Sequence, residues 1–233
     1  MQPTVTLHLG DCLDVLPTLA AGSVDAVVTD PPYGIEHSTG WVKMSADPEY
    51  NALRQTWNGG SIHGDNDTSL RDAILRWAGD LPCAVFGSWK RQRPTGTHTV
   101  LIWDKGPASG MGDLSIPWKP SWEEIYIIGR GWRGFRSEGV LKGHNVGTHI
   151  NMGRQHPNEK PVSLLIALIE KLPDAVTIFD PFMGSGSTGV AAVRCGKRFV
   201  GCEINPGYFA IAQRRIEQAR AQLALPLFGP QLT

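Results

Sequence analysis

The chain has 233 residues, which is enough for one domain with a sizeable core. Hydrophobic residues make up 41% and charged residues 19%, which argues against global disorder. The 22 Lys and Arg residues balance the 22 Asp and Glu residues, so the chain is no uniformly basic nucleic-acid binder and any basic surface must be local.

The cysteines and the N-terminal residues indicate the cellular compartment. The four cysteines form no C-x-x-C pair, so no zinc site is expected, and reduced thiols in a cytoplasmic protein are the better interpretation. The first residues, "MQPTVTLHLGD", are too polar for a signal peptide. No apolar stretch approaches the ~18 residues of a membrane helix.

The first half of the chain is predicted to alternate strands and helices. In order, we expect a strand at 4–9, a short helix in "CLDVLPTL", a strand at 24–29, an irregular segment at 34–67, a helix at 69–78 and a strand at 83–88. The irregular segment is rich in Gly, Asn and Asp and is too long for a simple connector. It is therefore expected to be a functional loop.

The second half continues the alternation. In order, we expect strands at 98–103 and 122–128, an irregular basic window at 129–156, a helix in "KPVSLLIALIEKL" (160–172), a strand at 175–180, the glycine loop "PFMGSGS", a helix at 188–196, the strand "RFVGCEI" and a last helix from Pro206. That last helix should end before Pro226. Strands that alternate with helices predict an α/β domain with a mostly parallel sheet.

The strongest local signal is "IFDPFMGSGST" (178–188), in which a buried strand runs into a glycine-rich turn that opens a helix. Ligands of open α/β sheets bind at such strand ends, and glycines let backbone N–H groups approach them. Asp180 precedes the loop, and Glu203 ends the next strand 23 residues later, where an acid commonly takes ribose hydroxyls. An adenosine-containing cofactor is indicated; an ordinary tight turn is the alternative.

With these motifs the chain resembles the amino-group DNA methyltransferases that use S-adenosylmethionine. "DPPY" (30–33) matches their catalytic motif, "DPFMGSGST" (180–188) matches their cofactor loop, and "HPNEKP" (156–161) precedes the latter, in an order that resembles the β group. "GDCLDVL", "VLIWDKG" and "EEIYIIG" match further stretches. The resemblance implies a Rossmann-like methyltransferase domain over 1–221, with a short target-recognition insert, and a tail at 222–233.

The resemblance assigns the catalytic corner to Asp30, Pro31, Pro32 and Tyr33. The target is an exocyclic base amine, whose lone pair is delocalised into the ring. Hydrogen bonds from this amine to Asp30 and to the Pro31 carbonyl would aim the lone pair at the methyl group, and Tyr33 would stack on the base. The prolines fix that carbonyl because their φ is locked. The base must leave the duplex, at a cost of about a few kcal/mol.

The resemblance also implies cofactor contacts. Asp180 should hold the amino group, Glu203 the ribose hydroxyls, and Asp11 the adenine N6. Lys160, or a nearby polar group, could meet the methionine carboxylate, with a solvated lysine as the alternative. Phe182 either lines the pocket or packs in the core. The remaining expected contacts are Cys12, Gly184, Ser185, Gly186, Ser187, Thr188 and Ile204.

Double-stranded DNA contact is expected mainly from the window 129–156. Its basic residues are Arg130, Arg133, Arg136, Lys142 and Arg154, against Glu138 alone. Arginine suits bidentate contacts to guanine and phosphate, although each charge could equally be a solvated surface group. The window is shorter than in many relatives, which implies a short target-recognition region. The loop 34–67 could share the contact, and "WKRQRP" (89–94) is a weaker basic cluster.

The leading functional hypothesis is methylation of adenine N6 in DNA. Cytosine N4 is the rival target, but relatives that act on cytosine more often carry Ser where Asp30 stands. An RNA or protein amine is a further alternative. A nucleic-acid-binding regulator that has lost activity is the alternative from another class, and the intact Asp30, Tyr33, Gly184 and Gly186 argue against it.

The tail contains "QLALPLF" (222–228). It resembles the short peptide by which bacterial replication proteins dock on the DNA sliding clamp, with Gln222, Leu223, Leu225, Leu227 and Phe228 at matching places. A free tail can extend into a pocket and present alternate side chains. The alternative is that these residues pack on the domain itself.

Overall fold

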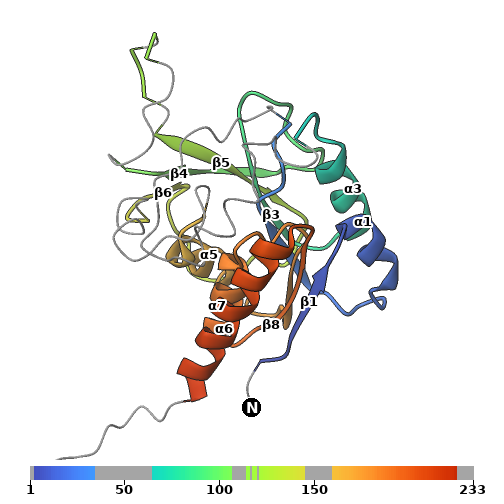
Figure 1. The fold of residues 1–233 in the computed structure, drawn as a ribbon. Helices are drawn as coiled ribbons and strands as arrows, with labels where there is room; N and C mark the ends of the chain where they lie inside the picture. Colours follow the sequence, from blue (N-terminus) through green and yellow to red (C-terminus); the bar gives the residue numbers. More distant parts are fainter. Residues whose placement is uncertain are drawn as a thin grey trace, which may run out of the picture.

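The computed structural model describes residues 3–34, 65–106, 114–115, 117–119, 121–144 and 159–224 (Figure 1). Its strands are β1 (Val5–Leu9), β2 (Ala26–Thr29), β3 (Cys83–Gly87), β4 (Thr99–Asp104), β5 (Trp122–Ile128), β6 (Val140–Leu141), β7 (Thr177–Asp180) and β8 (Arg198–Glu203). Its helices are α1 (Cys12–Val15), α3 (Ser69–Ala78), α5 (Val162–Ile169), α6 (Ser187–Arg194) and α7 (Pro206–Ala224), with a 3-10 turn at Leu16–Thr18.

The strands form one sheet in the order β1-β8-β7-β2-β3-β5-β4-β6. Pairing is parallel throughout except on the two sides of β5, which is antiparallel to β3 and to β4. The predicted α/β class with a mostly parallel sheet is therefore confirmed. One consequence matters for the site: β1, β8, β7, β2 and β3 all end at the same edge, called the carboxyl edge below.

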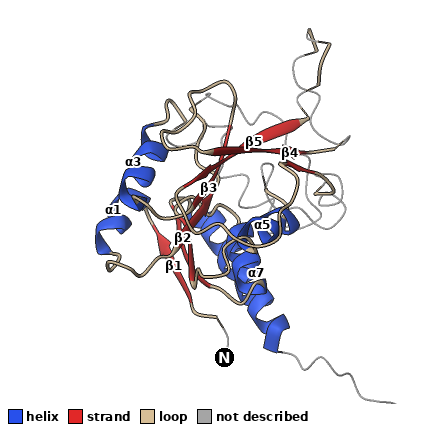
Figure 2. Cartoon of the chain, turned by 180° about the vertical axis from the view of Figure 1, so that it is seen from behind, coloured by secondary structure: helices blue, strands red, loops and turns tan. Residues whose placement is uncertain are grey.

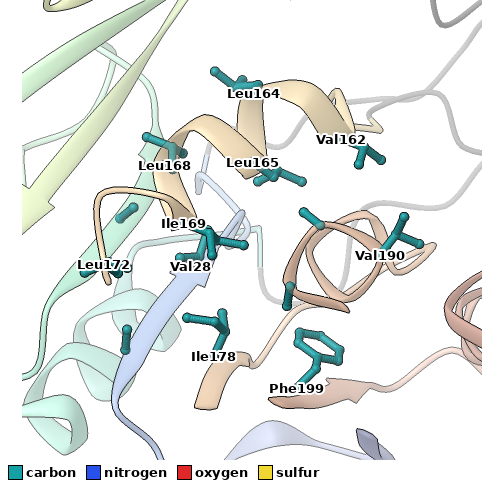
Figure 3. Close-up of a cluster of buried hydrophobic side chains, with 14 of the residues drawn as sticks. Val28, Val162, Leu164, Leu165, Leu168, Ile169, Leu172, Ile178, Val190 and Phe199 are labelled. Carbon is teal, nitrogen blue, oxygen red and sulfur yellow. The ribbon is translucent and has the colours of Figure 1, made fainter. Parts of the chain in front are cut away.

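Both faces of the sheet are covered, which explains the near-continuous apolar strands. In β2, Val28 belongs to a core cluster with α5, α6 and α7, and its neighbour Val27 belongs to a second cluster with α1 and α3. The view from behind separates these two groups of helices (Figure 2). Figure 3 shows the α5 side chains gathered over Val28 and Ile178 of the sheet.

Most predicted elements lie within a few residues of the observed ones, and the differences have local causes. The strand expected from 175 begins at Thr177, because the Asp25 carboxylate binds the backbone N–H groups of Val176 and Thr177 at 2.9 and 2.8 Å. The two-residue strand β6 was not predicted; it follows a glycine-rich stretch and only lengthens the edge of the sheet beside β4.

The ends of the chain and the long loop need separate mention. The last helix reaches Ala224 and buries a stripe of Ala212, Ile216 and Ala219 against the core, while Phe209 of the same helix is partly buried there. Residues 35–64 of the expected functional loop lie outside the described residues. Among the helices that are described, none is long and apolar enough to cross a membrane.

Candidate active site

Four predicted site carboxylates follow four parallel strands of one sheet. Asp11 comes after β1, Glu203 ends β8, Asp180 ends β7 and Asp30 follows β2, so all four lie at the carboxyl edge. In the strand order, β8 lies on the β1 side of β7, whereas β3 lies on the opposite side of β2. The connections that leave β7 and β2 therefore run in opposite directions, which makes the boundary between these two strands a topological switch point. Ligands of open α/β sheets bind at this kind of place.

Asp180 stands on one side of this boundary and is almost fully buried. Its Oδ1 accepts from the Thr29 hydroxyl of β2 at 2.7 Å and from the Phe182 N–H at 3.0 Å. Burial raises the pKa of Asp180 to about 6, although hydrogen bonds from Thr188 and Thr29 act against the rise. The Thr29 bond ties the end of β7 to the strand that carries Asp30.

Glu203 is held by backbone donors. One of its carboxylate oxygens accepts from the Gly184 N–H at 3.0 Å and the other from the Asn205 N–H at 2.8 Å. Burial raises its pKa, and these backbone bonds partly offset the rise. The carboxylate is thus oriented beside the glycine loop, where a hydroxyl-bearing ligand could reach its remaining lone pairs.

The two glycines of the predicted cofactor loop are required for different reasons. Gly184 has φ +50°, and a Cβ placed on it would meet nothing within 4 Å, so its surface is open. Gly186 has φ +83°, and a Cβ there would lie 2.9 Å from the Ala212 Cα of α7. Gly184 therefore leaves room for a ligand to approach the backbone, whereas Gly186 is demanded by helix packing as well as by its positive φ.

A polar cluster fastens the glycine loop from behind. Arg215 of α7 donates to the Ser185 carbonyl at 2.6 Å and to its hydroxyl at 2.8 Å. Arg215 also pairs with Glu159, whose carboxylate accepts from the Ser187 hydroxyl at 3.2 Å. Ser185 and Ser187 were predicted as cofactor contacts, yet these observed bonds serve the loop itself. Sequence patterns missed Arg215 because it lies in a helix far along the chain.

The remaining predicted cofactor residues are placed as follows. Asp11 is the N-cap of α1 and accepts from the Leu13 N–H at 2.9 Å. Cys12 is buried, which raises the pKa of its thiol to about 12 and leaves it inert. Phe182 packs against the α1 and α3 side of the core, and Ile204 is 44% exposed.

Asp30 stands on the other side of the boundary, and its two oxygens have different partners. Oδ1 accepts from the Tyr33 hydroxyl at 2.7 Å, and Oδ2 is 2.7 Å from the Lys160 ammonium. The pKa of Asp30 is raised, chiefly because the surrounding protein excludes water; the Lys160 charge opposes this rise and the nearby Glu123 charge adds to it.

Lys160 is buried and bridges two carboxylates. Its nitrogen is 3.0 Å from Glu123 Oε2, in addition to its contact with Asp30, and it lies 5.0 Å from the centre of the Phe86 ring. Burial by itself would lower the pKa of Lys160, but Asp30 and Glu123 outweigh burial and raise it. The structure thus brings Lys160 to the Asp30 corner, and its contact with a cofactor carboxylate stays a prediction.

Glu123 and Lys105 complete this corner and were not predicted from the sequence. Lys105, just after β4, is 2.5 Å from Glu123 Oε1, and the Tyr33 hydroxyl is 3.2 Å from Glu123 Oε2. Burial favours a raised pKa for Glu123, but the two lysines prevail and lower it. The available signal was the pair of acids that opens the otherwise apolar strand "WEEIYII".

The backbone just after the DPPY motif is held in place by contacts to Gly34. Pro31 is buried. Gly34, with φ +73°, donates its N–H to Asp65 at 2.6 Å and accepts from Arg91 through its carbonyl. A Cβ on Gly34 would meet the Asp67 backbone at 2.7 Å, so the turn after Tyr33 requires glycine.

The predicted DNA-binding residues divide between two edges. Arg130 and Arg133 follow β5, whose antiparallel run carries the chain away from the carboxyl edge; Arg133 pairs with Asp174 at 3.1 Å. Arg136 is exposed in the same segment. Lys142 follows β6 and returns to the carboxyl edge. Arg154 lies outside the described residues.

A second basic segment sits beside Asp30. The segment "WKRQRP" (89–94) comes shortly after the end of β3, the parallel neighbour of β2. Within it, Trp89 is 65% exposed, Lys90 is exposed, and Arg91 contacts the Gly34 carbonyl. The cluster that the sequence ranked second is thus the one that the structure brings to the candidate active site.

Among the described residues, no group of His, Cys, Asp and Glu could hold a metal ion.

Comparison with known proteins identifies the family. Residues 87–214, more than half of the chain, match the DNA methylase family N6/N4. The type II methyltransferase M2.DpnII of Streptococcus pneumoniae is 44% identical over 247 residues, covering 89% of this chain and 87% of that protein.

Solved structures agree on the fold. The M1.HpyAVI–SAM complex has a TM-score of 0.58 at 17% identity, with 91% of this chain and 99% of that chain covered. PvuII DNA methyltransferase, described as cytosine-N4-specific, has a TM-score of 0.60 at 16% identity, with 95% of each chain covered. The Rossmann-like methyltransferase fold is thereby confirmed, and the chain belongs to the N6/N4 DNA methylase family, whose methyl donor is S-adenosylmethionine.

Proposed function

We propose that this protein transfers a methyl group from S-adenosylmethionine to the N6 amine of adenine in double-stranded DNA, as a member of the β group. The observation that carries the proposal is the link between the Asp180 corner and the Asp30 corner. Thr29, the residue directly before Asp30, donates its hydroxyl to Asp180 at 2.7 Å. A cofactor on Asp180 and a base on Asp30 would therefore be neighbours, as methyl transfer requires.

The residues of the Asp30 corner supply position and charge. When bound, the cofactor would supply a methyl group on a sulfonium, from which a neutral thioether departs with the S–C bonding electrons. The methylated nitrogen then releases one N–H proton to water. Asp30 and the Pro31 carbonyl accept the two N–H bonds of the target amine, so that the nitrogen lone pair points at the methyl carbon. The Asp30 carboxylate also stabilises the positive charge that develops on this nitrogen. Tyr33 stacks on the extruded base.

The cofactor corner fits this donor. Asp180 and Glu203 offer carboxylate acceptors for its amino group and ribose hydroxyls, and the open side of Gly184 admits it next to the backbone. Asp11, at the end of β1, is assigned to its adenine N6. Ser185 and Ser187 are assigned to support the loop through Arg215 and Glu159.

Adenine is preferred over cytosine because an Asp, not a Ser, opens the DPPY motif. Cytosine N4 remains the second candidate, favoured by the likeness in fold to the PvuII cytosine-N4 enzyme. Unmethylated duplex DNA should be incubated with purified chain and S-adenosylmethionine, digested to nucleosides and analysed by mass spectrometry. N6-methyl-2′-deoxyadenosine is expected. N4-methyl-2′-deoxycytidine would establish the second candidate, and no methylated nucleoside would favour a binding-only regulator.

DNA is proposed to lie across the carboxyl edge. Lys90 and Lys142 flank this edge from β3 and β6, and the exposed Trp89 offers an apolar contact beside the duplex. The basic window 129–156 contributes through its part nearest this edge, whereas Arg130 and Arg133 are proposed to contribute little.

The C-terminal tail is proposed to dock on a bacterial sliding clamp through Gln222–Phe228. Gln222 and Leu223 are exposed on the last turns of α7, and residues 225–228 lie outside the described residues. Purified chain should bind immobilised clamp, and the variant Q222A/L225A should not. Equal binding by both chains would refute the docking, and activity on naked DNA should be unchanged.

A further inference from the structure

The corner around Asp30 contains more charge than the transfer itself requires. Asp30, Glu123, Lys160 and Lys105 are joined by contacts of 2.7, 3.0 and 2.5 Å. They come from four separate places: the end of β2, the start of β5, the residue before Pro161 and the end of β4. Two acids balance two lysines, so the group is neutral as a whole and each ammonium and carboxylate has a partner.

The two oxygens of Asp30 are not equivalent in this group. Oδ2 is held by Lys160, which is itself anchored on Glu123. Oδ1 accepts from the Tyr33 hydroxyl, which also lies 3.2 Å from Glu123 Oε2 and from the Lys160 nitrogen. The stacking role proposed for Tyr33 requires this hydroxyl to leave Asp30. When Tyr33 turns away, Oδ1 loses its donor while Oδ2 keeps its own. The Asp30 side chain is 28% exposed, so a base can reach it, and a half-buried carboxylate oxygen that has lost a donor favours a new one, such as an exocyclic N–H.

We propose that Lys160 and Glu123 are positioning residues for methyl transfer, which hold Asp30 by its Oδ2 so that its Oδ1 accepts from the target amine. The Tyr33 hydroxyl occupies the place of that amine in the free protein. Lys105 acts one step further out, by fixing Glu123. This inference depends on the proposed function and gives Lys160 a role at the target base instead of at the cofactor carboxylate.

Charge removal at Lys160 has a directional consequence. Asp30 is faced by Lys160, Glu123 and Tyr33, and it acts on Asp180 across the β7–β2 boundary. In Lys160→Met, Asp30 and Glu123 confront each other without the ammonium that both now bind. Like charges at one site raise a carboxyl pKa, so Asp30 takes up a proton at higher pH.

Charge removal at Glu123 acts in the opposite sense. In Glu123→Gln, the repulsive neighbour is gone, and Lys160 is left to Asp30 alone. The pKa of Asp30 should then fall. The two single variants thus move one titration in opposite directions, and the double variant K160M/E123Q brings it back towards that of the unmodified chain.

The experiment is the pH dependence of kcat for transfer of a radiolabelled methyl group to unmethylated duplex DNA. Saturating cofactor and DNA keep the titration of Asp180 out of the profile. We expect the acid limb to move up by about one pH unit in K160M and down in E123Q, with kcat at pH 8 lowered roughly tenfold in K160M. The dissociation constant for S-adenosylmethionine, measured by calorimetry, should stay within about threefold.

Each other outcome overturns a defined part of the account. Unmoved acid limbs in both single variants would contradict the positioning role, even if kcat fell. A tenfold or greater loss of cofactor affinity in K160M would assign Lys160 to the cofactor instead. Should K160M fail to fold, E123Q, which keeps the shape of the side chain, carries the test alone. An unmodified chain that methylates no DNA would overturn the proposed function together with this inference.

Discussion

An aspartate and a lysine can be compared at each end of the parallel strands: at the carboxyl edge, and at the opposite edge where these strands begin, called the amino edge. The two pairs are used differently. At the amino edge, Asp25 binds the N–H groups of Val176 and Thr177, and Lys197 binds the carbonyls of Leu172, Pro173 and Ala175 at 3.3, 2.9 and 2.6 Å. At the carboxyl edge, Asp30 and Lys160 bind each other at 2.7 Å. At the amino edge both side chains satisfy only backbone groups and fix the fold, whereas Asp30 and Lys160 satisfy one another and can exchange a partner for a ligand. Glu203, although two backbone N–H groups orient it, keeps lone pairs for a ligand.

The largest effect on cofactor affinity should come from a carboxyl-edge acid. Glu203→Ala removes the proposed acceptor for the ribose hydroxyls, so the dissociation constant for S-adenosylmethionine should rise about 100-fold, the equivalent of two hydrogen bonds to a charged group. Isothermal calorimetry measures it. Asp25→Asn at the amino edge is the matched control and should leave the affinity unchanged; equal losses in the two variants would erase the distinction between the edges.

The converse experiment is at the amino edge. Lys197→Met leaves three carbonyls without their shared donor, so the free energy of unfolding should fall by about 2 kcal/mol. Denaturant titration followed by circular dichroism checks this. Methyl transfer per folded molecule should match that of the unmodified chain. A loss of specific activity without loss of stability would show that Lys197 serves the active site and not the fold.

Asp180 gives the carboxyl edge a pH dependence. Its raised pKa of about 6 means that the ionised form is complete only above that pH and is lost as the pH falls through it. If the ionised carboxylate holds the cofactor amino group, affinity should fall about fivefold from pH 6 to pH 5, because the ionised fraction falls by that factor. Calorimetry at both pH values measures the change, and Asp180→Asn should bind weakly but with no such slope. A flat profile for the unmodified chain would remove Asp180 from cofactor binding.

The smallest effect concerns DNA. Replacing Lys90 and Lys142 by Gln should flatten the salt dependence of DNA binding by up to ~0.9 per lost phosphate contact. Replacing Arg130 and Arg133 should not, because their segment begins at the amino edge. Fluorescence anisotropy over a range of salt concentrations compares the two pairs. A flattened slope in the arginine variant would restore the interpretation that the sequence suggested first.

The different positions of the lysine pair and the arginine pair show what sequence patterns cannot predict. Apolar runs identified the strands because both faces of the sheet are buried, and the position of Asp30, Asp180 and Glu203 at strand ends followed from those runs. The direction of β5 did not follow, because periodicity is the same for parallel and antiparallel strands. Arg130 and Arg133 were therefore grouped with the site although β5 carries them from it.

The partner of a charged side chain was equally hidden. Lys160 was predicted as a ligand contact or a solvated residue, since 130 positions separate it from Asp30 and only the fold joins them. Glu123 looked like part of a strand, and Arg215 like part of a helix surface. The requirement for Gly186 was read as room for a ligand, but it also comes from the close approach of Ala212. Each of these is a tertiary contact that no local pattern encodes.

The measurement that tests the central claim most directly compares methyl transfer and cofactor binding in Asp30→Ala. If Asp30 holds only the target amine, transfer to DNA should fall by at least about 1000-fold, a loss on the scale of removing a preorganised group from a transition state. The calorimetric dissociation constant for S-adenosylmethionine should stay within about threefold of that of the unmodified chain. Retained transfer together with lost cofactor affinity would show that the two corners have been assigned the wrong way round.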